Sequence, residues 1–201
     1  MKQTEKNYLI GTGGCGMEFI QNKYHFDQHT HIRNMFIPIG VNFVYIFAHP
    51  YDVLMSFSKR NMLMGAHAIC AINGDHASSN MGGVVDLSTY LKQDIDCFQF
   101  GHHFNNYYSL NVNGIFIKYE CFESQLDVHM AKLGIKKKAD ILFRKRSSNY
   151  NDLDDSTLFK LEQKHGKYAE HFDSLPHVFI NEVKEDKFFW NKRWDNEFRL
   201  I

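Results

Sequence analysis

Three short hydrophobic runs stand out along the chain, and each is followed by a stretch with helical spacing. The runs are residues 7–12 (NYLIGT), 41–47 (VNFVYIF) and 115–119 (IFIKY). Their content of β-branched and aromatic residues predicts β-strands. Helices are expected over residues 17–23, 51–60, 86–108, 124–133 and 157–172. Because strands alternate with helices, the pattern predicts an α/β fold with a parallel sheet flanked by helices, in a single domain over residues 1–201.

Capping residues support the ends of several predicted helices. Pro50 suits the first turn of the second helix, Asp86 or Ser88 can cap the third, and Gly134 can end the fourth. Polar or aperiodic sequence between the periodic segments predicts loops over residues 25–34 and 65–83.

The charge balance limits which partners the chain can attract. Twenty-three basic residues offset 23 acidic ones, so the formal net charge is zero. This balance argues against broad binding to nucleic acid or to an anionic membrane, whereas a local anion pocket stays compatible with it. No apolar run approaches the roughly 20 residues of a transmembrane helix, and no signal-peptide hydrophobic stretch is visible. We therefore expect a soluble, intracellular, cytoplasmic protein, and the sequence does not indicate an oligomeric state.

The cysteines are widely spaced and form no Cys-x-x-Cys pair. They are Cys15, Cys70, Cys97 and Cys121. Buried, reduced thiols are the expectation for such cysteines.

A cluster of glycines follows the first predicted strand and precedes the first predicted helix. It reads Gly11-Thr12-Gly13-Gly14-Cys15-Gly16. A strand, a glycine turn and a helix form the arrangement in which backbone N–H groups at a helix N-terminus face a phosphate. Glycine-rich turns also occur as plain connections, so this cluster alone does not indicate a phosphate site. Other motifs in the chain must support that interpretation.

Four segments in order resemble the family of sulfotransferases that use 3′-phosphoadenosine 5′-phosphosulfate (PAPS). Residues 45–57 are similar to the strand–loop–helix that binds the 3′-phosphate, with Pro50, Asp52 and Ser56 at the family's spacing. The other three segments are residues 101–108 (GHHFNNYY), 115–120 (IFIKYE) and 143–146 (FRKR). The resemblance extends from about residue 8 to about residue 171 and implies a sulfotransferase-like, P-loop-type fold.

The chain departs from the family pattern at positions that carry charge. Gly14 stands where the family has a lysine or arginine, and Ala48 stands where it has an arginine. Cys15 and Met17 replace the hydroxyl residues of the first loop. Arg146 occupies the place of a late glycine.

The resemblance implies a set of residues around the donor. Main-chain amides of the first loop would hold the 5′-phosphosulfate, and Ser56 with the late basic pair would hold the 3′-phosphate. Arg60, four residues after Ser56, could supply the charge that Ala48 lacks. The implied donor-binding residues are Gly11, Thr12, Gly13, Gly14, Cys15, Gly16, Met17, Ser56, Arg60, Arg144 and Lys145. PAPS would be the co-substrate, and no metal is expected.

The transfer also needs a base, and histidines are the available candidates. His29 and His31 lie where the family often places a base, and His49 lies beside the proposed phosphate loop. Packing within the loops explains these histidines equally well. A metal site built from His25, His29 and His31 is a weaker alternative.

The sequence therefore predicts a PAPS-dependent sulfotransferase that acts on a hydroxyl or amine of a small molecule, glycan or lipid. The alternative is a catalytically impaired relative that binds a nucleotide, glycan or protein partner through the same cleft. A nucleoside-triphosphate kinase or hydrolase is disfavoured, since the first loop lacks the Gly-Lys-Ser/Thr ending that such enzymes use for phosphate and magnesium.

Overall fold

The computed structural model describes most of the chain between residues 6 and 181. The described residues are 6–33, 35–38, 41–60, 86–93, 96, 98–110, 112–122, 126–143, 145 and 149–181. The predicted loop over residues 65–83 and the candidate residue Arg144 lie outside them, as do Cys70 and Cys97.

A five-stranded, mostly parallel sheet forms the centre of the molecule. Its strands are β1 (Lys6–Gly11), β2 (Gln28–Thr30), β3 (Val41–Phe47), β4 (Gly114–Lys118) and β5 (Val178–Asn181). The spatial order is β2-β1-β3-β4-β5, with β5 antiparallel to β4 and the other neighbours parallel. The predicted α/β fold and the three strands expected from hydrophobic runs are thereby confirmed.

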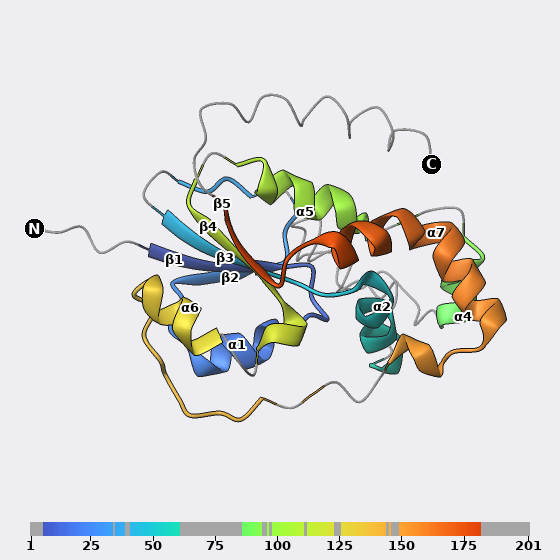
Figure 1. Ribbon diagram of the computed structural model, residues 1–201, viewed down its shortest axis with the longest axis horizontal. Coiled ribbons are helices and arrows are strands. Elements are labelled where there is room, and N and C mark those ends of the chain that lie inside the picture. Colours follow the sequence, from blue (N-terminus) through green and yellow to red (C-terminus); the bar gives the residue numbers. More distant parts are fainter. Residues whose placement is uncertain are drawn as a thin grey trace, which may run out of the picture.

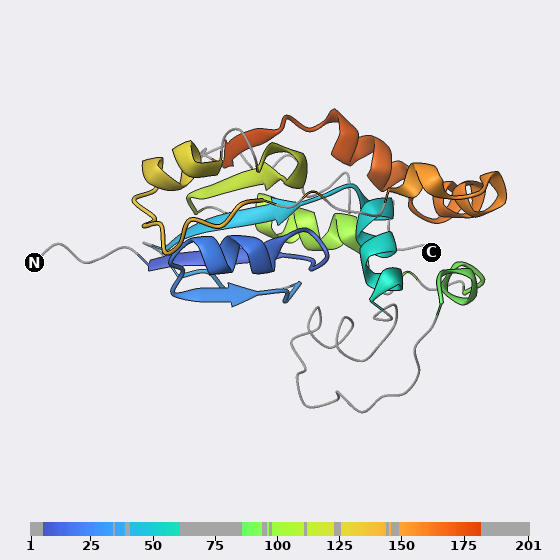
Figure 2. The ribbon, with the colours of Figure 1, turned by 90° about the horizontal axis from the view of Figure 1, so that it is seen from below.

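Helices cover both faces of the sheet and extend beyond one of its edges. They are α1 (Met17–Lys23), α2 (Pro50–Lys59), α4 (Leu87–Leu91), α5 (Phe100–Tyr108), α6 (Leu126–Lys132) and α7 (Asp155–Ser174). Figure 1 shows α5 on one side of the sheet and α1 with α6 on the other. Figure 2 shows α2 and α7 beyond the end at which the parallel strands finish. The loops at this carboxyl edge therefore lie between the sheet and two helices.

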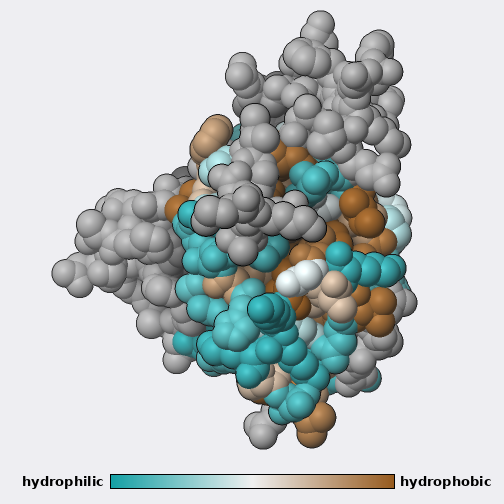
Figure 3. All heavy atoms as spheres, turned by 90° about the vertical axis from the view of Figure 1, so that its left-hand side faces the viewer, coloured by the Kyte–Doolittle hydropathy of each residue, from teal (hydrophilic) through white to brown (hydrophobic). Residues whose placement is uncertain are grey.

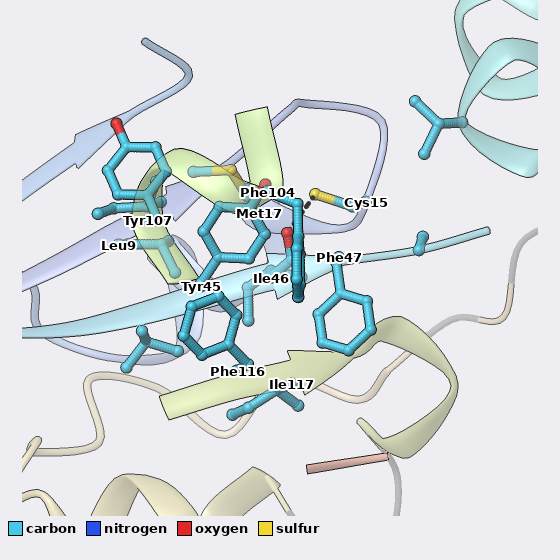
Figure 4. Close-up of a cluster of buried hydrophobic side chains, with 14 of the residues drawn as sticks. Leu9, Cys15, Met17, Tyr45, Ile46, Phe47, Phe104, Tyr107, Phe116 and Ile117 are labelled. Atoms are coloured by element: carbon cyan, nitrogen blue, oxygen red, sulfur yellow. Dashed lines mark hydrogen bonds between the residues drawn. The ribbon is translucent and has the colours of Figure 1, made fainter. Parts of the chain in front are cut away.

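Aromatic side chains dominate the core between the sheet and α5. Tyr45 from β3 lies 5.1 Å from the ring of Phe116 and 5.7 Å from that of Phe104, measured between centroids. All three residues are buried, and Figure 4 shows them with Phe47 beside the carboxyl-terminal half of β3. Burying rings of this size supplies a large part of the hydrophobic free energy of folding.

The surface at the opposite end of the strands is mixed in character. Figure 3 shows the side from which β1 starts, with hydrophilic residues over much of the described surface and hydrophobic ones in separate patches. Among the described residues, no helix combines the length and the apolar character needed to cross a membrane.

The single helix predicted over residues 86–108 is wrong, because the structure has two helices there. Asp86 caps α4 as predicted, accepting a hydrogen bond from the Thr89 amide at 2.7 Å. The chain then leaves the helical path, and Asp96 accepts hydrogen bonds from the amides of Phe98 and Gln99. Gln99 adopts a left-handed conformation with φ of 44° before α5 begins. A side chain bonded to nearby backbone amides competes with helical hydrogen bonds in this way.

Two short strands were not expected from the sequence. β2 lies within residues 25–34, which the polar composition assigns to a loop, and β5 follows the last helix. Both are edge strands. Edge strands can carry polar and short sequences because only one side of the backbone is paired.

Candidate functional site

The carboxyl edge of the sheet has a point where the chain connections diverge. From β1 the chain passes to β2 on one side, and it later forms β3 on the other side. The loops that leave β1 and β3 therefore separate at this point, which is where parallel α/β sheets commonly bind their ligands. The glycine loop, defined here as residues 11–17, leaves β1, and α2 begins directly after β3.

The glycine loop adopts backbone conformations that favour glycine. Gly13, Gly14 and Gly16 have φ values of 84°, 62° and 82°, in the left-handed region that other residues rarely adopt. A β-carbon on Gly16 would also lie 2.8 Å from a ring carbon of Tyr119. These glycines are therefore required by the shape of the loop.

Two side chains of the loop fold inward. Cys15 and Met17 are buried, and the Cys15 thiol donates a weak hydrogen bond to the Ile46 carbonyl at 3.5 Å, as Figure 4 shows. A β-carbon built on Gly11 would lie 2.7 Å from Met17 Sδ and 3.0 Å from Cys15 Sγ. The interior of the loop beside Gly11 is thus occupied by sulfur-containing side chains.

Helix α2 packs directly against the glycine loop. A β-carbon on Gly13 would lie 3.0 Å from Phe57 Cζ, and one on Gly14 would lie 3.1 Å from Val53 Cγ1. The Arg60 guanidinium lies over the Phe57 ring, 5.2 Å from its centroid. The exposed Arg60 therefore lies on the part of α2 that adjoins the loop.

Ser56 and Arg60 are brought together on α2. Arg60 Nη2 donates to Ser56 Oγ at 3.2 Å, and Arg60 Nε donates to the Ser56 carbonyl at 3.0 Å. These hydrogen bonds hold the Arg60 guanidinium beside the Ser56 hydroxyl, which the sequence analysis proposed as a phosphate-binding group.

The late basic segment approaches the same loop through aromatic contacts. Phe143 lies 5.1 Å from the ring of Tyr119, which in turn contacts Gly16. Lys145 is exposed two residues later. Arg144 and Arg146 lie outside the described residues.

The three histidines proposed as bases lie in different surroundings. His31 Nδ1 donates to the Gly11 carbonyl at 2.8 Å, so its lone pair is on Nε2. His29 is exposed on β2, where its Nδ1 pairs with Gln21 Nε2 at 3.0 Å. His49 Nδ1 accepts from the Tyr51 amide at 3.3 Å, and its Nε2 lies 3.7 Å from Asp173 Oδ2. Of the three, His31 has both the contact with the glycine loop and the tautomer that a general base needs.

His103 supports His31 from the core, and this role was not apparent from the sequence. His103 Nε2 donates to the His31 carbonyl at 3.0 Å, so its Nδ1 accepts from the Tyr45 hydroxyl at 2.7 Å. Burial lowers the pKa of His103 to about 3, so the ring is neutral at pH 7. The sequence singled out residues 101–108 only as part of the family resemblance, and the structure shows His103 fully buried.

A second feature of the carboxyl edge is a polar cavity of about 480 Å³. It opens where β3 and β4 end, beside the first turn of α2 and the last turn of α7. It is lined by Phe47, Ala48, His49, Asp52, Lys118, Glu120, Asn149, Tyr150, Asn151, Phe172, Asp173 and His177. From the sequence, only His49 in this set was a candidate site residue, and Asp173, His177 and residues 149–151 had no role. Their meeting depends on the path of α7, which no local pattern reveals.

Within the described residues, no group of three or more histidine, cysteine, aspartate or glutamate side chains is placed to hold a metal ion. Comparison of the chain with protein-family models, with curated proteins and with solved structures gave no match.

Proposed function

We propose that the chain is a P-loop-type sulfotransferase that transfers the sulfuryl group of PAPS to a hydroxyl or amine of a small molecule, glycan or lipid. The observation that carries this proposal is the convergence of segments that lie far apart in the sequence. The Phe57 ring of α2 lies against Gly13, Tyr119 lies against Gly16, and Phe143 lies against Tyr119. Segments selected for donor binding thus adjoin one loop at the edge where such sheets bind ligands.

The proposed donor site has a source of positive charge despite Gly14 and Ala48. Arg60 adjoins the glycine loop through Phe57 and already holds the Ser56 hydroxyl. In the proposed complex, Arg60 and Ser56 bind one phosphate group, and Lys145 with Arg144 approaches from the late segment. Charge-assisted hydrogen bonds of this kind are about twice as strong as neutral ones.

The reaction needs one bond exchange and one proton transfer. The sulfur–oxygen bond to the donor's phosphate breaks with its electron pair leaving on the phosphate oxygen, while the acceptor's oxygen or nitrogen forms a new bond to sulfur. The acceptor's proton passes to a base, and His31 Nε2 is our candidate because Nδ1 is held by Gly11. Amides of the glycine loop would stabilise the charge on the leaving oxygen.

One observation favours a second function, in which the chain binds a nucleotide, glycan or protein partner without catalysis. Cys15 and Met17 fill space beside Gly11 that a phosphate cradle would leave open. If these side chains keep their places in solution, the loop amides are less accessible to a phosphosulfate.

Calorimetric titration with adenosine 3′,5′-bisphosphate, the product of the donor, tests the site itself. We expect micromolar binding to the full chain, and about 10- to 100-fold weaker binding to Arg60→Ala, the range for losing a charge-assisted hydrogen bond. Lys59→Ala is the matched control, since Lys59 is an exposed basic residue at the same end of α2. It should change the affinity less than about 2-fold, as expected for a screened surface charge.

Turnover separates the two candidate functions. Release of adenosine 3′,5′-bisphosphate from PAPS that depends on an added acceptor supports the transferase. Binding without release over hydroxyl, phenol, sugar and amine acceptors supports the second function. Absence of binding to the unaltered chain would contradict the donor site in either form.

A further inference from the structure

The polar cavity is separate from the glycine loop. None of residues 11–17 lines it. Val53 contacts Gly14 of the loop, whereas its neighbour Asp52 lines the cavity. The first turn of α2 therefore lies between the loop and the cavity, which can hold a ligand of its own.

Aromatic rings line part of this cavity. The rings of His49 and Tyr150 are stacked, with centroids 4.6 Å apart and an angle of 18° between planes, and form the His49–Tyr150 wall. The rings of Phe47 and Phe172, both buried, lie 5.7 Å apart and are also part of the lining. Flat apolar surfaces of this kind favour a ligand that contains a ring.

The charged groups around the opening are mostly negative. Asp52, Glu120 and Asp173 come from three different elements, and Lys118 is the single lysine or arginine among the described lining residues. Lys118 donates to the main-chain carbonyl of Asp173 at 3.3 Å, not to its carboxylate. Glu120 is exposed and has no hydrogen bond or ion pair with another described residue. The cavity lining thus carries three carboxylates and one ammonium group.

The tyrosines beside the cavity experience this negative potential. Burial raises the pKa of Tyr150, and Asp173, Asp52 and Glu120 raise it further. Burial also raises the pKa of Tyr51 to about 12, and the carboxylates of Glu162, Asp173 and Glu170 add to this shift. The same field that opposes a phenolate would oppose an anionic ligand and attract a cation.

We propose that this cavity is a binding site for a small organic cation, namely a primary amine attached to a ring. The ring stacks against the His49–Tyr150 wall, and the ammonium group lies between the carboxylates of Glu120 and Asp173. Asn149 and Asn151 at the rim donate to or accept from further polar groups of the ligand. This site goes beyond the proposed donor site and does not depend on it.

Three probes with one ring and different charge test the proposal. Benzylamine is a cation at pH 7, benzyl alcohol is neutral and benzoate is an anion. We expect titrations of the ¹⁵N-labelled full chain, followed by NMR, to show millimolar or tighter binding of benzylamine. Benzyl alcohol should bind about 10-fold more weakly, which corresponds to the loss of one favourable ion pair, and benzoate should not bind. Shifts should centre on amides of residues 49–52, 118–120 and 149–151.

A charge-neutralising variant and a matched control locate the effect. The double variant Glu120→Gln and Asp173→Asn should lose about 10-fold in benzylamine affinity and leave that of benzyl alcohol unchanged. Both residues are exposed, so the fold should persist, and the spectrum of the free protein checks this. Glu18→Gln is the control, since Glu18 is an exposed residue of α1 that does not line the cavity and does not contribute to the pKa shift of Tyr51 or Tyr150. This variant should bind benzylamine like the unaltered chain.

Three results would overturn the proposal. Benzoate could bind with the same affinity as benzylamine, benzylamine could fail to bind, or the double variant could keep the full affinity for benzylamine. Because adenosine 3′,5′-bisphosphate is titrated separately, failure of the donor site and failure of the cation site give different results.

Discussion

At the scale of single residues, a chain of hydrogen bonds leads from the core to the glycine loop. The Tyr45 hydroxyl donates to His103, His103 donates to the His31 carbonyl, and the His31 ring donates to the Gly11 carbonyl. Each histidine uses one nitrogen as a donor to a carbonyl, so both tautomers are determined by their surroundings. In the neutral ring of His31 the lone pair therefore lies on Nε2, the atom that we propose as the base.

His31→Asn tests this role. Because the amide nitrogen of asparagine can replace Nδ1 as a donor to Gly11, the variant keeps the contact and loses the basic Nε2. If the chain is a sulfotransferase, we expect turnover of PAPS to fall by at least about 100-fold, the usual contribution of a general base. The affinity for adenosine 3′,5′-bisphosphate should change less than about 3-fold. Steady-state turnover and calorimetry measure the two quantities.

His25→Asn is the matched control, since His25 is an exposed histidine just before β2, whereas His31 directly follows β2. It should leave turnover unchanged. Full turnover in His31→Asn would exclude His31 as the base, and so would a pH profile of turnover that the substitution leaves unaltered.

Residue patterns in the sequence identified part of the site and missed the rest. Gly13, Gly14 and Gly16 were selected because a glycine cluster between a strand and a helix has a known use. Ser56 was selected by the resemblance to the 3′-phosphate motif, and Arg60 by its helical spacing from Ser56. The support of His31 by His103 joins residues more than 50 positions apart, and so does the lining of one cavity by Glu120 and Asp173. No local pattern contains such pairs, so they became visible only in the folded chain.

At the scale of elements, the close approach of α5 to α7 depends on one glycine. Gly101 in α5 is buried under the ring of Tyr168 in α7, and a β-carbon there would collide with the ring atoms Cε1, Cδ1 and Cζ. Gly166 lies in α7 itself, but its β-carbon would meet only the flexible Glu162 side chain at 3.3 Å and the Tyr51 hydroxyl at 3.9 Å. The position of Gly101 thus excludes a larger residue, whereas the position of Gly166 has room for one.

The substitutions Gly101→Ala and Gly166→Ala should act in opposite directions. Gly101→Ala pushes the Tyr168 ring away, and we expect a loss of about 1–3 kcal/mol in the free energy of unfolding, as for overpacking elsewhere. Gly166→Ala should be neutral or stabilising by up to about 1 kcal/mol, because alanine favours the helix over glycine. Urea denaturation of both variants and of the unaltered chain measures the difference. Equal stability of the two variants would contradict this account of the α5–α7 contact.

Elements with strong local signals were predictable, and those made by distant contacts were not. The buried strand β3 and the helix α2 with Pro50 in its first turn follow from composition and capping. The break between α4 and α5 was missed because it depends on Asp96 binding the amides of Phe98 and Gln99. β2 and β5 were missed because pairing with a neighbour, rather than a hydrophobic run, holds an edge strand.

At the scale of the whole molecule, neutral histidines are built into separate parts of the core. His103 lies between β3 and α5, and His165 lies between α4 and α7, where its Nε2 pairs with the Tyr90 hydroxyl at 2.9 Å. Burial lowers the pKa of His103 to about 3 and that of His165 to about 4. For His165, Asp96 partly opposes this shift and Lys164 adds to it. Both rings must stay uncharged for the core to form.

These histidines predict that the fold loses stability in mild acid. Between pH 6.5 and about 4, the unfolded chain binds protons on both histidines and the folded chain does not, so acid favours unfolding. Each histidine contributes a slope of about 1.4 kcal/mol per pH unit over its window.

The carboxyls with lowered pKa, such as Asp127, lose their contribution only at lower pH, near and below 3.8. Urea denaturation in steps from pH 7.5 to 4.5 should therefore show stability falling above the pH range in which these carboxyls with lowered pKa lose their contribution. In His165→Gln, the slope of the free energy of unfolding against pH should be smaller between pH 6 and 5. The expected decrease is about 1.4 kcal/mol per pH unit, which corresponds to one proton, whatever the stability of the variant at pH 7.5. An unchanged slope would mean that His165 takes up its proton over the same pH range in the folded chain as in the unfolded chain, which would contradict the neutral, buried ring inferred for the fold.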